Sequence, residues 1–86
     1  MDFGSALEAL KGGFKVQRSG WNGKGMFIYL VPENRYAPTT NAGAELAGED
    51  GKVAYGAYLA MKTAQGNVVP WVASQTDLLA SDWEMV

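Results

Sequence analysis

The residues best suited to ligand chemistry lie between Arg18 and Phe27. Trp21 offers a flat face for stacking on a planar base, and Asn22 with neighbouring backbone N–H groups suits the polar edges of such a base. The cationic side chains of Arg18 and Lys24 suit phosphate groups. A structural alternative remains open, because an Asn-Gly pair is a strong hairpin signal and a tight turn would fold Trp21 back as a lid on the core. Turn chemistry alone favours that alternative.

A second group of candidate residues lies near the end of the sequence. Trp71 could add another aromatic wall to a binding site, or it could pack in the core or at an interface. Ser74 and Asp77 have the spacing of a helix capping box, which favours a structural role, although they could also rim a pocket. Asp82 could accept hydrogen bonds from ribose hydroxyls, or it could be a solvated strand end.

Two missing residue types restrict the chemistry. The 86 residues include no Cys and no His, which excludes Ser-His-Asp and Cys-His triads, thiolate nucleophiles and His-ligated metals. Only carboxylates, lysines and hydroxyls remain for catalysis. The composition therefore favours a binding protein, with no catalytic residue, metal or cofactor expected.

The charge distribution restricts the partners. A formal net charge of −2 argues against sequence-independent binding to DNA or RNA. Residues 1–43 nevertheless contain five basic and three acidic side chains, and residues 44–86 contain two basic and six acidic ones. A small anionic ligand can therefore still be attracted to the N-terminal half. An acidic start and the absence of a long apolar run predict a cytosolic protein without a membrane anchor.

Short elements must position the candidate residues. Apolar residues at i, i+3, i+4 and i+7 predict a helix over residues 3–11, with Asp2 as its N-cap. Alternation over residues 14–18 predicts a half-buried strand. Residues 26–31 are apolar at both odd and even positions, so both faces of this strand would be apolar. Such a strand is typical of the centre of a sheet, with both faces covered by the core or one face covered by a second subunit. The two strands can pair as a hairpin through residues 21–24.

The second half begins with residues 32–52, which show no sustained periodicity and predict a long functional or mobile loop. The elements expected in and after this loop are one helical turn at 42–47, a strand at 53–63, a turn at 64–67, a strand at 68–72 in which Pro70 indicates a sheet edge or a bulge, a short helix after the capping box, and a last strand at 82–86. Together they predict one α+β domain over residues 1–86. It would have a small, mostly antiparallel sheet of about five strands and two short helices.

Two blocks of the sequence resemble a known family. The first block runs Phe3-Gly4-x-Ala6-Leu7-x-x-Leu10-Lys11-x-Gly13 and continues as Val16-x-Arg18-x-Gly20-Trp21-Asn22-Gly23-Lys24-Gly25-Met26. The second block runs Trp71-x-x-Ser74-Gln75-x-Asp77-Leu78-Leu79-Ala80-x-Asp82-Trp83. In this order and spacing they resemble the second Thoeris anti-defence family of small phage proteins. The resemblance covers nearly the whole chain, and the central loop matches least.

The resemblance implies a signal sponge in the cytoplasm of the infected bacterial host. Members of the family form homo-oligomers, usually tetramers, whose subunits combine to hold glycocyclic ADP-ribose intact, and some also bind cyclic dinucleotides at a separate site. By position, the resemblance implies eight ligand-binding residues: Trp21, Asn22, Gly23, Phe27, Trp71, Ser74, Gln75 and Asp77. Arg18 and Lys24 are the expected phosphate contacts.

Two other function classes remain open. An enzyme that degrades such signals would need carboxylates such as Asp77 and Asp82 to converge on one pocket. A structural or interaction module would use its aromatic surface to contact only protein.

Overall fold

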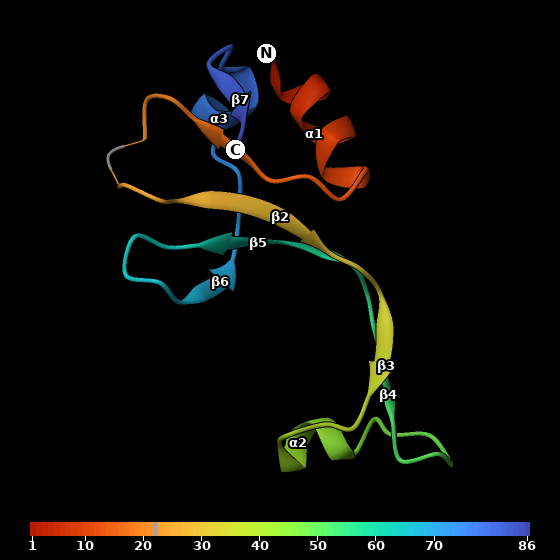
Figure 1. The fold of residues 1–86 in the computed structure, drawn as a ribbon. Helices are drawn as coiled ribbons and strands as arrows, with labels where there is room; N and C mark the ends of the chain where they lie inside the picture. Colours follow the sequence, from red (N-terminus) through yellow and green to blue (C-terminus); the bar gives the residue numbers. More distant parts are fainter. Residues whose placement is uncertain (22) are drawn as a thin grey trace.

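Five antiparallel strands form the main sheet, in the order β6-β5-β2-β1-β7. The computed structural model describes residues 1–21 and 23–86 (Figure 1). The strands of this sheet are β1 (Val16–Arg18), β2 (Phe27–Val31), β5 (Tyr58–Lys62), β6 (Val68–Pro70) and β7 (Trp83–Met85). The helices α1 (Phe3–Lys11) and α3 (Gln75–Leu79) contact each other beside the sheet. The predicted α+β class is confirmed.

Helix α1 begins and ends where the sequence predicts. The Asp2 carboxylate accepts a hydrogen bond from the Ser5 N–H at 2.8 Å, which satisfies one free donor of the first turn. Gly12 caps the C-terminus, and Gly13 follows with φ of +90°, a conformation that favours glycine. Local capping signals therefore define both ends.

Strand β2 is the central strand, as predicted. It pairs with β1 on one edge and β5 on the other, with Ile28 opposite both Val16 and Met61. The side chain of Ile28 is buried against α1, whereas Phe27 and Tyr29 point to the opposite face and are half-buried. The sheet therefore has one face covered by helices and one open face. The Asn-Gly turn predicted between β1 and β2 includes Asn22, which lies outside the described residues.

The core lies between α1 and the covered face. Its buried residues are Ala6, Leu10, Val16, Ile28 and Trp83. Trp83 is the largest of them and is only 1% exposed. This single side chain therefore supplies a large share of the apolar volume of a small core.

The capping-box helix and the edge strand also confirm predictions. The Ser74 hydroxyl accepts from the Asp77 N–H, and the Asp77 carboxylate accepts from the Ser74 N–H, both at 3.0 Å. Strand β6 lies at the edge of the sheet and includes Pro70. The next residue, Trp71, donates its N–H inward to the Leu59 carbonyl at 2.9 Å. Because alternate residues point their N–H groups to opposite sides, Pro70 occupies a position whose N–H would face outward.

The prediction of a structureless connection over residues 32–52 was wrong. This region forms an arm, defined here as residues 32–57, which contains β3 (Asn34–Tyr36), α2 (Asn41–Ala44) and β4 (Val53–Tyr55). Strand β3 pairs antiparallel with β4, but β3 has only three residues, too few for alternation to be visible in the sequence. The predicted helical turn exists, shifted to α2, where Thr40 is the N-cap.

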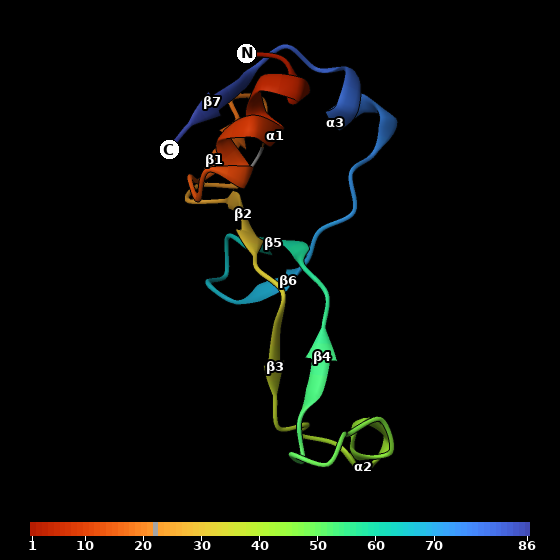
Figure 2. The same ribbon diagram turned by 90° about the vertical axis from the view of Figure 1, so that its right-hand side faces the viewer.

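The single strand predicted over residues 53–63 was also wrong, because the chain leaves strand geometry at Gly56 and Ala57. The break separates β4, in the arm, from β5, in the main sheet. Figure 2 shows the arm projecting away from the rest of the molecule. The radius of gyration is therefore 15.4 Å, compared with about 12 Å for a compact chain of this length. Among residues 1–21 and 23–86, no helix has the length and apolar character that a membrane span requires.

Candidate ligand-binding site

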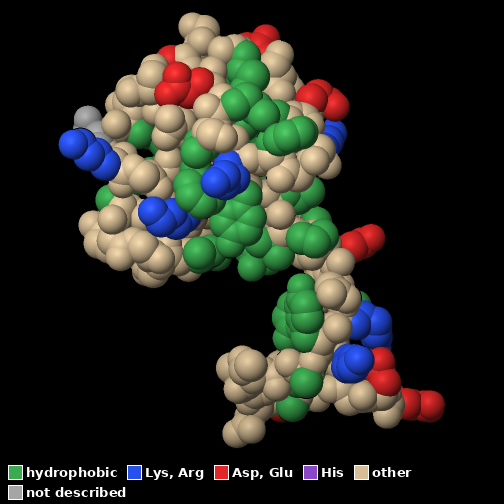
Figure 3. All heavy atoms as spheres, viewed as in Figure 1, with side chains coloured by type: hydrophobic (Ala, Val, Ile, Leu, Met, Phe, Trp, Pro, Cys, Tyr) green, Lys and Arg blue, Asp and Glu red, His purple; other side chains and the backbone are tan. Residues whose placement is uncertain are grey.

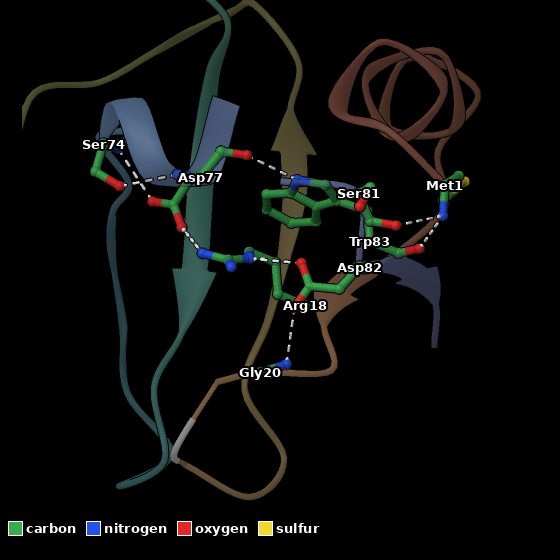
Figure 4. Close-up of polar contacts among 8 residues, drawn as sticks. All are labelled: Met1, Arg18, Gly20, Ser74, Asp77, Ser81, Asp82 and Trp83. Atoms are coloured by element: carbon green, nitrogen blue, oxygen red, sulfur yellow. Dashed lines mark hydrogen bonds and ion pairs between the residues drawn. The ribbon is translucent and has the colours of Figure 1, made fainter. Parts of the chain in front are cut away.

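Arg18 links three parts of the chain beside the core by binding Asp77 and Asp82, and these three side chains are called the Arg18 cluster. Arg18, at the end of β1, donates from Nη1 to Asp77 Oδ1 at 2.9 Å and from Nε to Asp82 Oδ1 at 2.8 Å (Figure 4). Asp77 lies in α3, and Asp82 immediately precedes β7. The three side chains are between 14% and 30% exposed, so water screens this contact less than it screens a surface ion pair.

Backbone donors occupy the remaining carboxylate oxygens. Asp77 Oδ2 accepts from the Ser74 N–H, and Asp82 Oδ2 accepts from the Gly20 N–H at 3.0 Å. A Cβ on Gly20 would approach Asp82 Oδ2 to 2.9 Å, so glycine permits this close contact. Each carboxylate therefore has one cationic and one backbone donor.

These partners keep both carboxylates ionised. Burial alone would raise the pKa of Asp77, but the Ser74 N–H and the Arg18 guanidinium outweigh burial and lower that pKa. The hydrogen bond from Arg18 lowers the pKa of Asp82 against a smaller opposing effect of burial, and the Gly20 N–H lowers it further. Neither group carries a proton near neutral pH, so neither can act there as a general acid.

The cluster predicts a specific loss of stability in acid. Folding lowers both carboxyl pKa values below their ordinary value of 3.8, so the unfolded chain binds more protons as the pH falls. The stabilisation is present above pH 3.8 and is lost as the pH falls through the lowered pKa values of the folded state. In urea unfolding, the stability difference between the protein and Arg18→Gln should be largest at neutral pH and shrink in acid. A difference that does not change with pH would contradict the prediction.

A cluster of aromatic rings lies next to the Arg18 cluster. Trp83 is at its centre, with ring centroids 5.4 Å from Trp21, 5.9 Å from Trp71 and 5.3 Å from Phe3. Trp21 and Trp71 meet Trp83 edge-on and remain half-buried. They therefore pack against the core, as the structural alternative predicts, and also keep part of their rings at the surface.

The structure divides the predicted site residues between the two faces of the sheet. On the helix-covered side it brings together Arg18, Trp21, Trp71, Ser74, Gln75 and Asp77. Gln75 is exposed at the start of α3. Phe27 lies across the sheet, since it adjoins the core residue Ile28. These residues therefore do not form one pocket within a single chain.

Besides Trp21, the connection between β1 and β2 contains three predicted site residues, of which the structure describes Gly23 and Lys24. Gly23 is close to the β5–β6 turn, where a Cβ would meet the Met26 side chain and come within 3.0 Å of Ala64. Lys24 is exposed. Asn22 lies outside the described residues.

Two grooves at the arm were not predicted from the sequence. The larger groove, about 350 Å³, is lined by Tyr36, Ala37, Thr39, Tyr55 and Tyr58. The smaller one, about 210 Å³, lies beside the Arg35–Asp50 ion pair, whose atoms are 2.9 Å apart. The signal in the sequence is the recurrence of tyrosine, with Tyr36 in the expected loop and Tyr55 and Tyr58 in the expected strand that follows it. In the described part of the chain, no group of three acidic side chains is arranged to hold a metal.

Known proteins match the chain from end to end. The model of the Tad2-like family, described as the Thoeris anti-defense 2-like domain, matches residues 1–86. The chain is also 45% identical over 87 residues to a Bacillus phage SP01 protein named Thoeris anti-defense 2, and the alignment covers all of this chain and 94% of that relative. The resemblance predicted from the two sequence blocks is confirmed, and the chain belongs to the Tad2-like family of Thoeris anti-defense 2-like domains.

Proposed function

We propose that this protein is a phage anti-defence sponge that binds a nucleotide-derived immune signal without cleaving it. Membership of the Tad2-like family supports the anti-defence role. The binding mechanism depends mainly on one observation: Arg18 holds both Asp77 and Asp82 as ionised acceptors. Such carboxylates can accept hydrogen bonds or balance charge, but they have no proton to donate near neutral pH.

The proposed ligand is glycocyclic ADP-ribose, with a cyclic dinucleotide as a further ligand. An adenine-containing ligand requires an aromatic surface, and the half-buried rings of Trp21 and Trp71 provide one on the helix-covered side. The exposed amide of Gln75 can bind polar groups beside these rings. The site is expected to operate in the cytoplasm of the infected bacterium.

The proposed assembly is a homo-oligomer, expected to be a tetramer. Because Phe27 and the tryptophans lie on opposite faces of the sheet, a pocket that contains both must combine two chains. The arm is the proposed subunit contact. Its tyrosines Tyr36 and Tyr55 are both exposed, with ring centroids 5.2 Å apart, and a two-stranded hairpin is at best marginally stable in water by itself.

The test is recovery of the ligand. The protein is incubated with glycocyclic ADP-ribose, separated from free ligand and heated, and the released compound is identified by mass spectrometry. The expected result is unchanged glycocyclic ADP-ribose. Gln75→Ala should retain less ligand, whereas the matched change Gln65→Ala, in the exposed β5–β6 turn, should not.

The same experiment discriminates between the alternatives. Asp77 and Asp82 do converge, on Arg18, so an enzyme that degrades the signal is the second candidate. Recovery of a converted product would establish that candidate instead. Retention of neither glycocyclic ADP-ribose nor a panel of cyclic dinucleotides would favour a protein interaction module.

A further inference from the structure

The open face of the sheet has two lysines around one aromatic ring. The ammonium nitrogens of Lys15 and Lys62 lie 4.9 Å and 5.8 Å from the centre of the Phe27 ring. Both distances are in the range of cation–π attraction. Figure 3 shows Lys and Arg side chains lying against hydrophobic side chains in the part of the molecule that holds the main sheet.

Strand pairing places these groups together. Lys62 in β5 is directly opposite Phe27 in β2, so the two side chains share a face. Lys15 precedes Val16, whose side chain is in the core, so Lys15 points to the open face. The arrangement therefore follows from the register and is not a chance contact between flexible side chains.

In the part of the chain that the structure describes, no acidic side chain balances the charges of these lysines. Among residues 1–21 and 23–86, neither ammonium group lies within ion-pair distance of a carboxylate. Within the described residues, Lys62 makes one hydrogen bond, to the Gly25 carbonyl at 3.0 Å, which leaves two of its three N–H donors for a ligand. Two like charges held near one ring repel each other, and an anion between them would relieve that repulsion.

Arg18, the phosphate contact expected from the sequence, is in a different situation. Two carboxylates surround its guanidinium, so the cluster as a whole is negative. A phosphate approaching Arg18 would meet Asp77 and Asp82 and be repelled by them. The open face is thus the better location for the negative part of a ligand.

We propose that Lys15 and Lys62 bind the phosphate groups of the nucleotide-derived ligand, and that Phe27 holds their ammonium groups in place. This inference rests on the proposed function and assigns the anionic part of the same ligand. Two cations match the two charges of a diphosphate. Since the tryptophans lie on the other face, the base and the phosphates would be bound by different subunits of the oligomer.

The inference is tested by calorimetry with glycocyclic ADP-ribose at low and high salt. Lys15→Gln and Lys62→Gln should each weaken binding about tenfold at low salt, the loss expected when one charged hydrogen bond is removed. The affinity of both variants for the ligand should also depend less on the salt concentration. Lys11→Gln, a matched change on α1, should bind like the unaltered protein.

The remaining outcomes separate this inference from the proposed function. If the protein binds the ligand and both open-face variants bind it equally well, the phosphate assignment is overturned and the sponge stands. If these variants change only the mass of the oligomer, the open face is a subunit contact and the assignment is again overturned. If the protein binds neither glycocyclic ADP-ribose nor a cyclic dinucleotide, the proposed function fails and the assignment fails with it.

Discussion

Replacement of Trp83 by alanine should remove most of the free energy that stabilises the fold. Trp83 is only 1% exposed, contacts three other aromatic rings and donates from Nε1 to the Asp77 carbonyl at 2.9 Å. Removing a fully buried Trp costs about 3–5 kcal/mol. Small domains have total stabilities of about 5–15 kcal/mol, and a chain of this length is expected near the low end. Urea unfolding followed by circular dichroism measures the loss.

Two further variants control for this result. Leu79→Ala removes an apolar side chain that is 84% exposed, so its stability should change by less than about 0.5 kcal/mol. Trp83→Phe keeps an aromatic ring but removes the Nε1 donor and part of the volume, so its stability should be intermediate. If Trp83→Ala unfolded at nearly the same urea concentration as the unaltered protein, the central role of Trp83 in the core would be refuted.

Removal of the arm should convert the proposed oligomer into folded monomers. Val31, the last residue of β2, pairs with Tyr58, the first residue of β5. An Asn-Gly pair can therefore replace residues 32–57 as a two-residue hairpin turn between them. The deletion leaves the whole core cluster in place, because none of its residues lies in the arm. The expected result, measured by sedimentation, is one chain per particle with the circular dichroism of a folded sheet. Binding that requires a pocket between subunits should be lost as well.

A gentler change tests the same contact with the arm intact. Tyr36→Ser combined with Tyr55→Ser removes this pair of exposed, tilted rings and should weaken the proposed oligomer. Val72→Ser, at an exposed apolar residue outside the arm, should leave its mass unchanged. If the unaltered protein sediments as a monomer, the proposed assembly is wrong. If the shortened chain remains an oligomer, the contact lies elsewhere.

The elements that could be predicted are those with local signals. Helix α1, the capping box of α3 and the apolar strand β2 each depend on residues a few positions apart, where spacing and side-chain chemistry are sufficient. The position of Pro70 at a sheet edge was predicted for the same reason, since proline cannot donate to a neighbouring strand. Strand β3 was missed because its three residues carry too little periodicity, and the break between β4 and β5 was missed because alternation continues across Gly56 and Ala57.

The candidate site was harder to predict because it depends on contacts between distant residues. Arg18 meets carboxylates 59 and 64 positions further along the chain, and no local pattern indicates that pairing. The separation of Phe27 from the tryptophans follows from strand parity, but only once Ile28 is known to face the core. Lys62 was not singled out because its neighbour Phe27 comes from another strand.

Pro70 affects how the protein behaves at high concentration, because it lies on an edge strand of the main sheet. The proposed sponge neutralises a signal by holding it, so its binding sites must be at least as numerous as the signal molecules. A high protein concentration is therefore part of that proposed function. Exposed strand edges become dangerous at high concentration, because they recruit further chains into growing sheets. Pro70 removes an outward N–H from the edge strand β6, and β7 at the other edge has only three residues. The main sheet is thereby protected against uncontrolled edge-to-edge growth.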